Sequence, residues 1–149
     1  MVAGPDPGHA FPAIALCLRF LAAGDTPVLL TGVEWLDTAR TAGLEAVELA
    51  GLDPGEDDDD SDAGAKIHQR AARMAVLNVP VLTDLGCDLV VSDVITACGG
   101  MAAELIGIPW VELSPHPLYL PSKGLPPVGS GLAPGTGVGG RLRDTVMRA

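Results

Sequence analysis

The chain has 149 residues, of which 48% are hydrophobic and 3% aromatic, and its formal net charge is −10. This length suits one domain with an aliphatic core, and the apolar fraction excludes general disorder. The acidic balance argues against a nucleic-acid footprint and against electrostatic docking on an anionic membrane, because both need clustered Lys and Arg.

The cysteines and the N-terminal region indicate a cytoplasmic protein. Cys17, Cys87 and Cys98 lie in apolar stretches and form no C-x-x-C pair, so we expect buried, reduced thiols. No secretory signal is visible. The apolar stretch 11–23 is interrupted by Arg19 and is too short to span a bilayer.

Strand and helix patterns alternate along the chain. A strand stub at 2–4 leads into turn residues 4–8, and Pro12 then opens a helix at a first-turn position, where its missing N–H does no harm. Pro80 is expected to kink or divide the long helix that contains it. The expected strands are 27–31, 44–49, 89–91 and 109–113, and the expected helices are 12–23, 34–42, 65–85, 96–106 and 141–148.

This alternation predicts an α/β fold, namely a Rossmann-like, doubly wound parallel sheet in three layers, α/β/α. The strands are near-continuous apolar runs, as a sheet covered on both faces requires. The expected strand order is 3-2-1-4-5, with the first strand central. That strand is truncated, because only three residues precede the turn where five or six are typical.

Two segments differ from this pattern. The stretch 51–64 is acidic and Gly/Pro-bearing, and we interpret it as a solvated surface loop. Residues 121–149 form a Pro/Gly-rich connection and the start of a further helix, so the Rossmann-like domain is expected to occupy 1–120. A formal G-x-G-x-x-G match at 135–140 lacks the preceding strand that a dinucleotide site needs, and we reject it as a cofactor loop.

One histidine and one carboxylate are expected at the same crevice. Ligands of open parallel sheets bind beyond the carboxyl ends of the strands, at the point where the strand order reverses. His9 follows the first strand and Asp93 follows the fourth. A neutral imidazole can take a proton from a hydroxyl, and a carboxylate behind it fixes the tautomer. The alternative from spacing alone is that each residue caps the helix that follows it.

Two segments carry a resemblance to a known family. The segment 4–13, GPDPGHAFPA, is similar to the G-x-x-x-G-H-x-x-P turn of GT-B glycosyltransferases. It resembles both the enzymes that glycosylate lipids and natural products with nucleotide sugars such as UDP-sugars, and the lipid-linked N-acetylglucosaminyltransferase of peptidoglycan synthesis. The stretch 88–93, DLVVSD, followed by 102–111, AAELIGIPWV, resembles a strand-helix-strand unit of the natural-product family.

The resemblance implies an inverting sugar transfer in which His9 is the catalytic base and Asp93 its partner. Residues 1–120 would be the N-terminal acceptor domain. The resemblance implies no metal and no cofactor, only a nucleotide-sugar donor, UDP- or dTDP-linked. Its site would lie on a C-terminal domain that we expect to be missing here, so the isolated chain is expected to be inactive.

We assign Gly8, Phe11 and Thr96 to acceptor binding. His116, just past the last strand, is assigned with them, although an ordinary loop histidine is the alternative. Trp35 and Trp110 are expected to pack rather than to stack on a ligand.

Two other function classes stay open. One is a non-catalytic truncated fragment or partner subunit that binds an acceptor or another chain, with self-association through apolar surface. The other is an unrelated Rossmann-like nucleotide-binding domain. The expected partners are a small-molecule or lipid acceptor and no nucleic acid. Three C-terminal arginines leave a peripheral membrane contact open: Arg141, Arg143 and Arg148.

Overall fold

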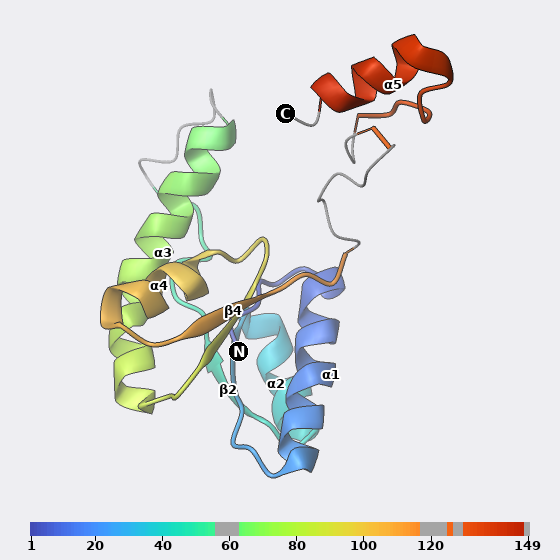
Figure 1. Cartoon of the computed structure of the whole chain (residues 1–149). Helices are drawn as coiled ribbons and strands as arrows, with labels where there is room; N and C mark the ends of the chain where they lie inside the picture. The colour runs from blue at the N-terminus through green and yellow to red at the C-terminus, as the bar shows by residue number, and fades with distance from the viewer. Residues whose placement is uncertain (56–62, 117–124, 127–129, 148–149) are drawn as a thin grey trace. The chain divides into compact units, whose positions relative to one another are not determined.

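The computed structural model describes residues 1–55, 63–116, 125–126 and 130–147 (Figure 1). Most of the acidic run that we interpreted as a loop, residues 56–62, lies outside the described residues. The chain separates into two compact units, Met1–Pro115 and His116–Ala149. The first unit holds four helices and four strands of the described chain, and the second holds one helix.

The strands of the first unit form one parallel arrangement in the expected order. β1 (Val28–Thr31) pairs with β2 (Glu45–Glu48), and β3 (Val90–Asp93) pairs with β4 (Trp110–Leu113). Val2 joins the two pairs, because it bridges Leu30 of β1 and Ser92 of β3. The spatial order is therefore β2, β1, Val2, β3, β4. This confirms the predicted order, with a central strand that is reduced to a single bridging residue.

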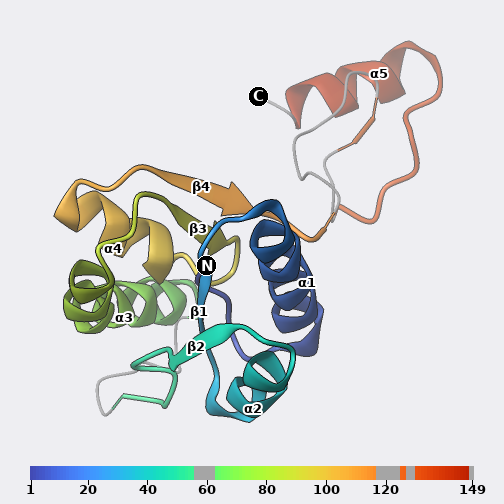
Figure 2. The same cartoon turned by 90° about the horizontal axis from the view of Figure 1, so that it is seen from below.

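Helices cover both faces of this sheet, as predicted for a doubly wound fold (Figure 2). α1 (Pro7–Ala23) and α2 (Val33–Thr41) pack on one face and enclose a core cluster that includes Ala13, Cys17 and Leu29. α3 (Ala63–Leu85) and α4 (Cys98–Ile106) cover the other face, over a cluster that includes Leu30 and Val90. The buried hydrophobic residues are aliphatic or sulfur-containing throughout the described chain, which confirms the expected core.

Helix α1 begins five residues earlier than the sequence pattern indicated. Its N-cap is Asp6, whose carbonyl accepts the N–H groups of His9 at 2.9 Å and Ala10 at 2.8 Å. Pro7 then occupies the first helical position, which tolerates a residue without an N–H. Pro12 lies inside the helix instead of opening it, and the carbonyl that it leaves unpaired belongs to Gly8, which is exposed. His9 is consequently a residue of the first helical turn, not of a loop.

Two other helices differ from their expected form. α3 runs through Pro80 as one helix, so the proline does not divide it. In the second unit α5 (Gly137–Val146) begins four residues before the predicted start. The buried carboxylate of Asp144 binds the segment that leads into this helix, because it accepts the N–H of Gly135 at 2.7 Å. It also accepts the Nε–H of Arg143 at 2.8 Å.

Helix α4 lies close to the sheet because two of its residues have no side chain. A Cβ atom at Gly99 would lie 2.7 Å from Cβ of Val2 and 2.8 Å from Oγ of Ser92. A Cβ atom at Gly100 would lie 2.8 Å from the indole ring of Trp110. These contacts are shorter than real Cβ atoms make, so both positions require glycine at the present helix–sheet distance.

Substituting Gly99 with alanine should destabilise the first unit, because the added methyl group pushes α4 away from Val2. We expect a loss of about 1–3 kcal/mol in the free energy of unfolding, measured by urea denaturation. Gly8→Ala is the matched control, since no atom lies within 4 Å of a Cβ built there. Its stability should stay the same or rise by up to about 1 kcal/mol through helix propensity. Equal stability of the Gly99→Ala variant and the unsubstituted chain would contradict this packing.

The three cysteines should differ in reactivity, because Cys17 and Cys98 are buried whereas Cys87 is half-buried. Burial raises the pKa of the Cys98 thiol to about 11 and also raises the pKa of Cys17. At about pH 8 only about one Cys98 in a thousand is then a thiolate, which is the form that reacts. Mass spectrometry after brief iodoacetamide treatment should find Cys87 modified first. In denaturant all three should react alike; a native chain in which Cys98 matches Cys87 would refute this order.

Candidate active site

The site lies where the central bridge and β3 end. The chain leaves Val2, passes through Gly4 and Pro5, and enters α1, which carries His9 in its first turn. β3 ends at Asp93. Nδ1 of His9 lies 2.6 Å from Oδ1 of Asp93, and both side chains are buried, with 7% and 1% of each residue exposed. The structure thus brings together two residues that are 84 positions apart, at the carboxyl end of the sheet.

The Asp93 carboxylate is held at both oxygens. Oδ1 faces His9, while Oδ2 accepts the Ile95 N–H at 3.2 Å and the Thr96 hydroxyl at 3.1 Å. The Asp93 N–H donates to the Val2 carbonyl at 2.8 Å, so the residue is also tied to the centre of the sheet. A carboxylate with this many donors has one preferred orientation in the site.

Neither residue caps the helix that follows it. Asp6 is the N-cap of α1 and Ala97 is the N-cap of α4, and neither makes a capping bond through its side chain. His9 is not the N-cap of α1, because it lies inside that helix and its Nδ1 contacts Asp93. Asp93 does not cap α4 either, because one oxygen faces His9 and the other binds Ile95 and Thr96 in the turn that precedes the helix.

This geometry defines what the imidazole can do. A hydrogen on Nδ1 is placed to bond with the carboxylate, so we assign the Nδ1–H tautomer to neutral His9. Nε2 then carries the lone pair that can accept a proton. The buried carboxylate stabilises the imidazolium that such a proton transfer produces. The arrangement therefore leaves Nε2 as the ring nitrogen that can accept a proton, while the carboxylate holds Nδ1.

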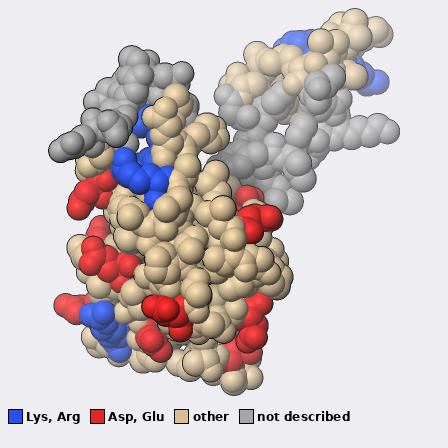
Figure 3. Space-filling view, turned by 90° about the vertical axis from the view of Figure 1, so that its left-hand side faces the viewer, with Lys and Arg blue, Asp and Glu red and all other residues tan. Residues whose placement is uncertain are grey.

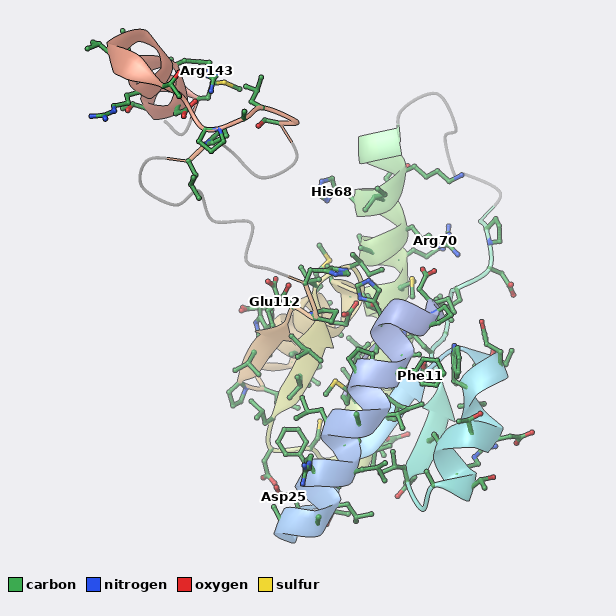
Figure 4. The ribbon with its side chains drawn as sticks, turned by 90° about the vertical axis from the view of Figure 1, so that its right-hand side faces the viewer. Phe11, Asp25, His68, Arg70, Glu112 and Arg143 are labelled. Atoms are coloured by element: carbon green, nitrogen blue, oxygen red, sulfur yellow. The ribbon has the colours of Figure 1, made fainter. Side chains whose placement is uncertain are left out.

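The assigned acceptor residues have different surroundings. Gly8 is exposed in the first turn of α1, next to His9. Phe11 is 55% exposed and packs edge-on against Trp35, with ring centroids 4.8 Å apart. Phe11 points toward α2, where it contacts Trp35 (Figure 4), whereas His9 contacts Asp93 of β3. The Trp35 indole donates to the Pro5 carbonyl at 2.6 Å, so the expected packing role of Trp35 agrees with its contacts.

Thr96 and His116 lie in contrasting places. Thr96 is buried, and its hydroxyl bonds with Asp93. His116 is exposed and is the first residue of the second unit. The acceptor-binding roles of Gly8, Phe11, Thr96 and His116 stay predictions.

A cavity of about 230 Å³ adjoins Asp93 on the side of α4 and β4. Trp110 lies in its wall, packed on Gly100, and donates its indole N–H to Glu104 at 2.8 Å. Figure 4 shows Glu112, another lining residue, on the β4 side of the domain, away from Phe11. Sequence reasoning singled out neither glutamate, because an acidic residue in an exposed helix or edge strand gives no local signal.

A larger cavity, of about 780 Å³, lies at the opposite, amino ends of the strands. Its wall includes Val28 and Val90, the first residues of β1 and β3. Sheets of this kind bind ligands at the carboxyl ends of their strands. The region around His9 and Asp93 is therefore a better candidate site than this larger cavity.

Figure 3 shows how charged side chains are distributed over one face of the molecule. There, acidic side chains are spread over several places, and basic side chains form small separate groups. In the described part of the chain, no group of three or more His, Cys, Asp or Glu side chains is arranged to hold a metal ion. No helix among the described residues has the length and apolar character needed to cross a membrane.

Comparison with known sequences confirms the resemblance inferred from the motifs. No family model matches the chain. The chain is 31% identical over 124 residues to an L-demethylnoviosyl transferase from Streptomyces niveus. The match covers 74% of this chain and 32% of the relative, so the chain spans about a third of the length of the relative that it matches.

Comparison with solved structures confirms the fold. The glycosyltransferase SsfS6 of Streptomyces sp. SF2575, solved with thymidine diphosphate, superimposes with a TM-score of 0.62 at 21% identity. It covers 76% of this chain, which covers 37% of SsfS6. MurG of Acinetobacter baumannii superimposes with a TM-score of 0.59 at 19% identity, over 76% of this chain and 34% of that protein. The chain therefore resembles GT-B glycosyltransferases in sequence and has the Rossmann-like fold of part of their length.

Removing the Asp93 side chain should destabilise the first unit, because it leaves the buried His9 ring and the turn donors of Ile95 and Thr96 without their acceptor. We expect Asp93→Ala to lower the free energy of unfolding at neutral pH by about 1–3 kcal/mol. Asp88→Ala, a change of the same kind at an exposed position just before β3, should stay within about 0.5 kcal/mol. Comparable losses in the two variants, measured by urea denaturation, would argue against a special role for the Asp93 contacts.

Proposed function

We propose that this chain supplies the acceptor side of an inverting glycosyltransferase, with His9 as the catalytic base and Asp93 as its orienting partner. The observation that carries the proposal is the buried contact of 2.6 Å between Nδ1 of His9 and Oδ1 of Asp93, at the carboxyl end of a sheet with the glycosyltransferase fold. Residues 1–120 form the acceptor domain in this proposal, and residues 121–149 form the connection that follows it.

The proposed reaction is a single displacement. Nε2 of His9 takes the proton from an acceptor hydroxyl, and that oxygen forms a bond to the anomeric carbon of the sugar. The bond from this carbon to the phosphate oxygen breaks, so the nucleoside diphosphate leaves with the electron pair. Attack opposite to the leaving group inverts the anomeric configuration. Asp93 keeps Nδ1–H in place and offsets the positive charge that develops on the ring.

The proposed donor is a sugar linked to thymidine diphosphate. Two structural relatives support this choice, because SsfS6 and a spinosyn rhamnosyltransferase were both solved in complex with thymidine diphosphate. Both cover 76% of this chain, while the chain covers 37% of SsfS6 and 34% of the spinosyn rhamnosyltransferase. The donor site therefore belongs, in this proposal, to a region comparable to the remaining two thirds of these enzymes.

The base assignment predicts a large loss of turnover in a His9→Ala variant. The assay uses a chimera in which this chain replaces the matching part of the Streptomyces niveus transferase, with dTDP-glucose and the fluorescent phenol 4-methylumbelliferone as substrates. Removing His9 should lower kcat/KM by about 10²–10⁴, the usual contribution of a general base. His68→Ala is the control, because His68 is exposed on α3, and it should leave turnover unchanged. A His9→Ala chimera that keeps full turnover would refute the assignment.

A further inference from the structure

Thr96 is placed where it can set the geometry of the proposed catalytic pair. The residue lies in the turn between β3 and α4 and is only 6% exposed. Its hydroxyl donates to Oδ2 of Asp93 at 3.1 Å, and its N–H donates to the Asp93 carbonyl at 2.9 Å. One threonine therefore contacts the aspartate through both its side chain and its backbone.

The two carboxylate oxygens of Asp93 therefore contact different parts of the site. Oδ2 is held by the Thr96 hydroxyl and by the Ile95 N–H, both from the turn. Oδ1 is the oxygen that faces His9. A carboxylate can rotate broadly about its last side-chain bond unless its oxygens are held. Donors on Oδ2 restrict this rotation and so keep Oδ1 directed at Nδ1 of His9.

Thr96 is itself fixed from three directions. Its carbonyl accepts the Ser92 hydroxyl at 3.0 Å and the Gly99 N–H at 3.2 Å. On the other side lies Gly4, where a Cβ atom would come within 3.0 Å of the Thr96 hydroxyl oxygen. The turn therefore closes on itself by hydrogen bonds and is packed against the segment that leads into α1. Because the Thr96 hydroxyl is held in place, its hydrogen bond to Oδ2 restricts the orientation of the Asp93 carboxylate.

We propose that Thr96 is a positioning residue whose hydroxyl holds the Asp93 carboxylate in the orientation that fixes the Nδ1–H tautomer of His9. The inference rests on the proposed function, because it concerns the same histidine–aspartate pair. It gives Thr96 a role different from direct acceptor binding: the hydroxyl is buried, and its hydrogen is engaged with Asp93.

The test follows the ring nitrogens of His9 by ¹⁵N NMR in the 149-residue chain, so it needs neither donor nor acceptor. The pH is raised until the ring is neutral. A fixed Nδ1–H tautomer gives two well-separated nitrogen signals and a slowly exchanging Nδ1–H proton. Thr96→Val keeps the shape of the side chain but removes the donor. We expect its two nitrogen signals to move toward each other and its Nδ1–H signal to be lost.

Two further variants make this change specific. Thr96→Ser restores the hydroxyl and should restore the separated signals of the unsubstituted chain. Thr31→Val is the matched control, because Thr31 is fully buried and its hydroxyl faces the Gly4 carbonyl at 3.5 Å, not Asp93. It should leave the His9 signals unchanged. If Thr96→Val does not fold, Thr96→Ala takes its place, since it removes the hydroxyl without adding bulk.

The outcomes separate the two proposals. Unchanged His9 signals in Thr96→Val, with the Nδ1–H tautomer present in the unsubstituted chain, would overturn the positioning role alone. Equal changes in Thr96→Val and Thr31→Val would overturn it as well, because they would reflect packing and not the hydroxyl. Absence of the Nδ1–H tautomer from the unsubstituted chain would instead refute the His9–Asp93 pair, and with it the proposed mechanism.

Discussion

The first unit depends on the hydrogen bonds around Val2. The Val2 N–H donates to Val91 and its carbonyl accepts from Asp93, each at 2.8 Å, while Met1 and Ala3 bond to Leu30 on the other side. These few bonds join β1 and β2 to β3 and β4. They also place the two parts of the site, because His9 follows this bridge along the chain and Asp93 is bonded to it. The sheet and the proposed catalytic pair thus share one point of attachment.

Gly99 of α4 allows this helix to pack closely on the other face of the sheet, next to Val2. Because Gly99 has no side chain, α4 can approach both Val2 and Ser92 closely. Ser92 in turn bonds to the turn that carries Thr96. The contact between helix and sheet therefore reaches Asp93 through a short series of hydrogen bonds. A shift of α4 relative to the sheet would therefore alter the hydrogen bonds around the Asp93 carboxylate.

The sequence predicted those features that depend on period and strand order. The apolar runs and turn residues located each element of the first unit to within a few residues, except the start of α1, and the strand order together with the family motif paired His9 with Asp93. The start of α1 was missed because Pro12 resembles a first-turn proline, and only the Asp6 carbonyl bonds show that Pro7 has this place. The contacts of Gly99 with Val2 and of Trp110 with Gly100 depend on distances between elements, which no local pattern contains.

The central position of Val2 also governs the order in which the chain can fold. Its two neighbours in the sheet come about thirty and ninety residues later, so the N-terminal segment emerges from the ribosome long before its second neighbour exists. The pair β1–β2 is closed by a short connection and can form early, whereas the bridge to β3 carries a larger entropic cost of loop closure. The contact between His9 and Asp93 therefore requires closure of the same long loop that joins the N-terminal segment to β3.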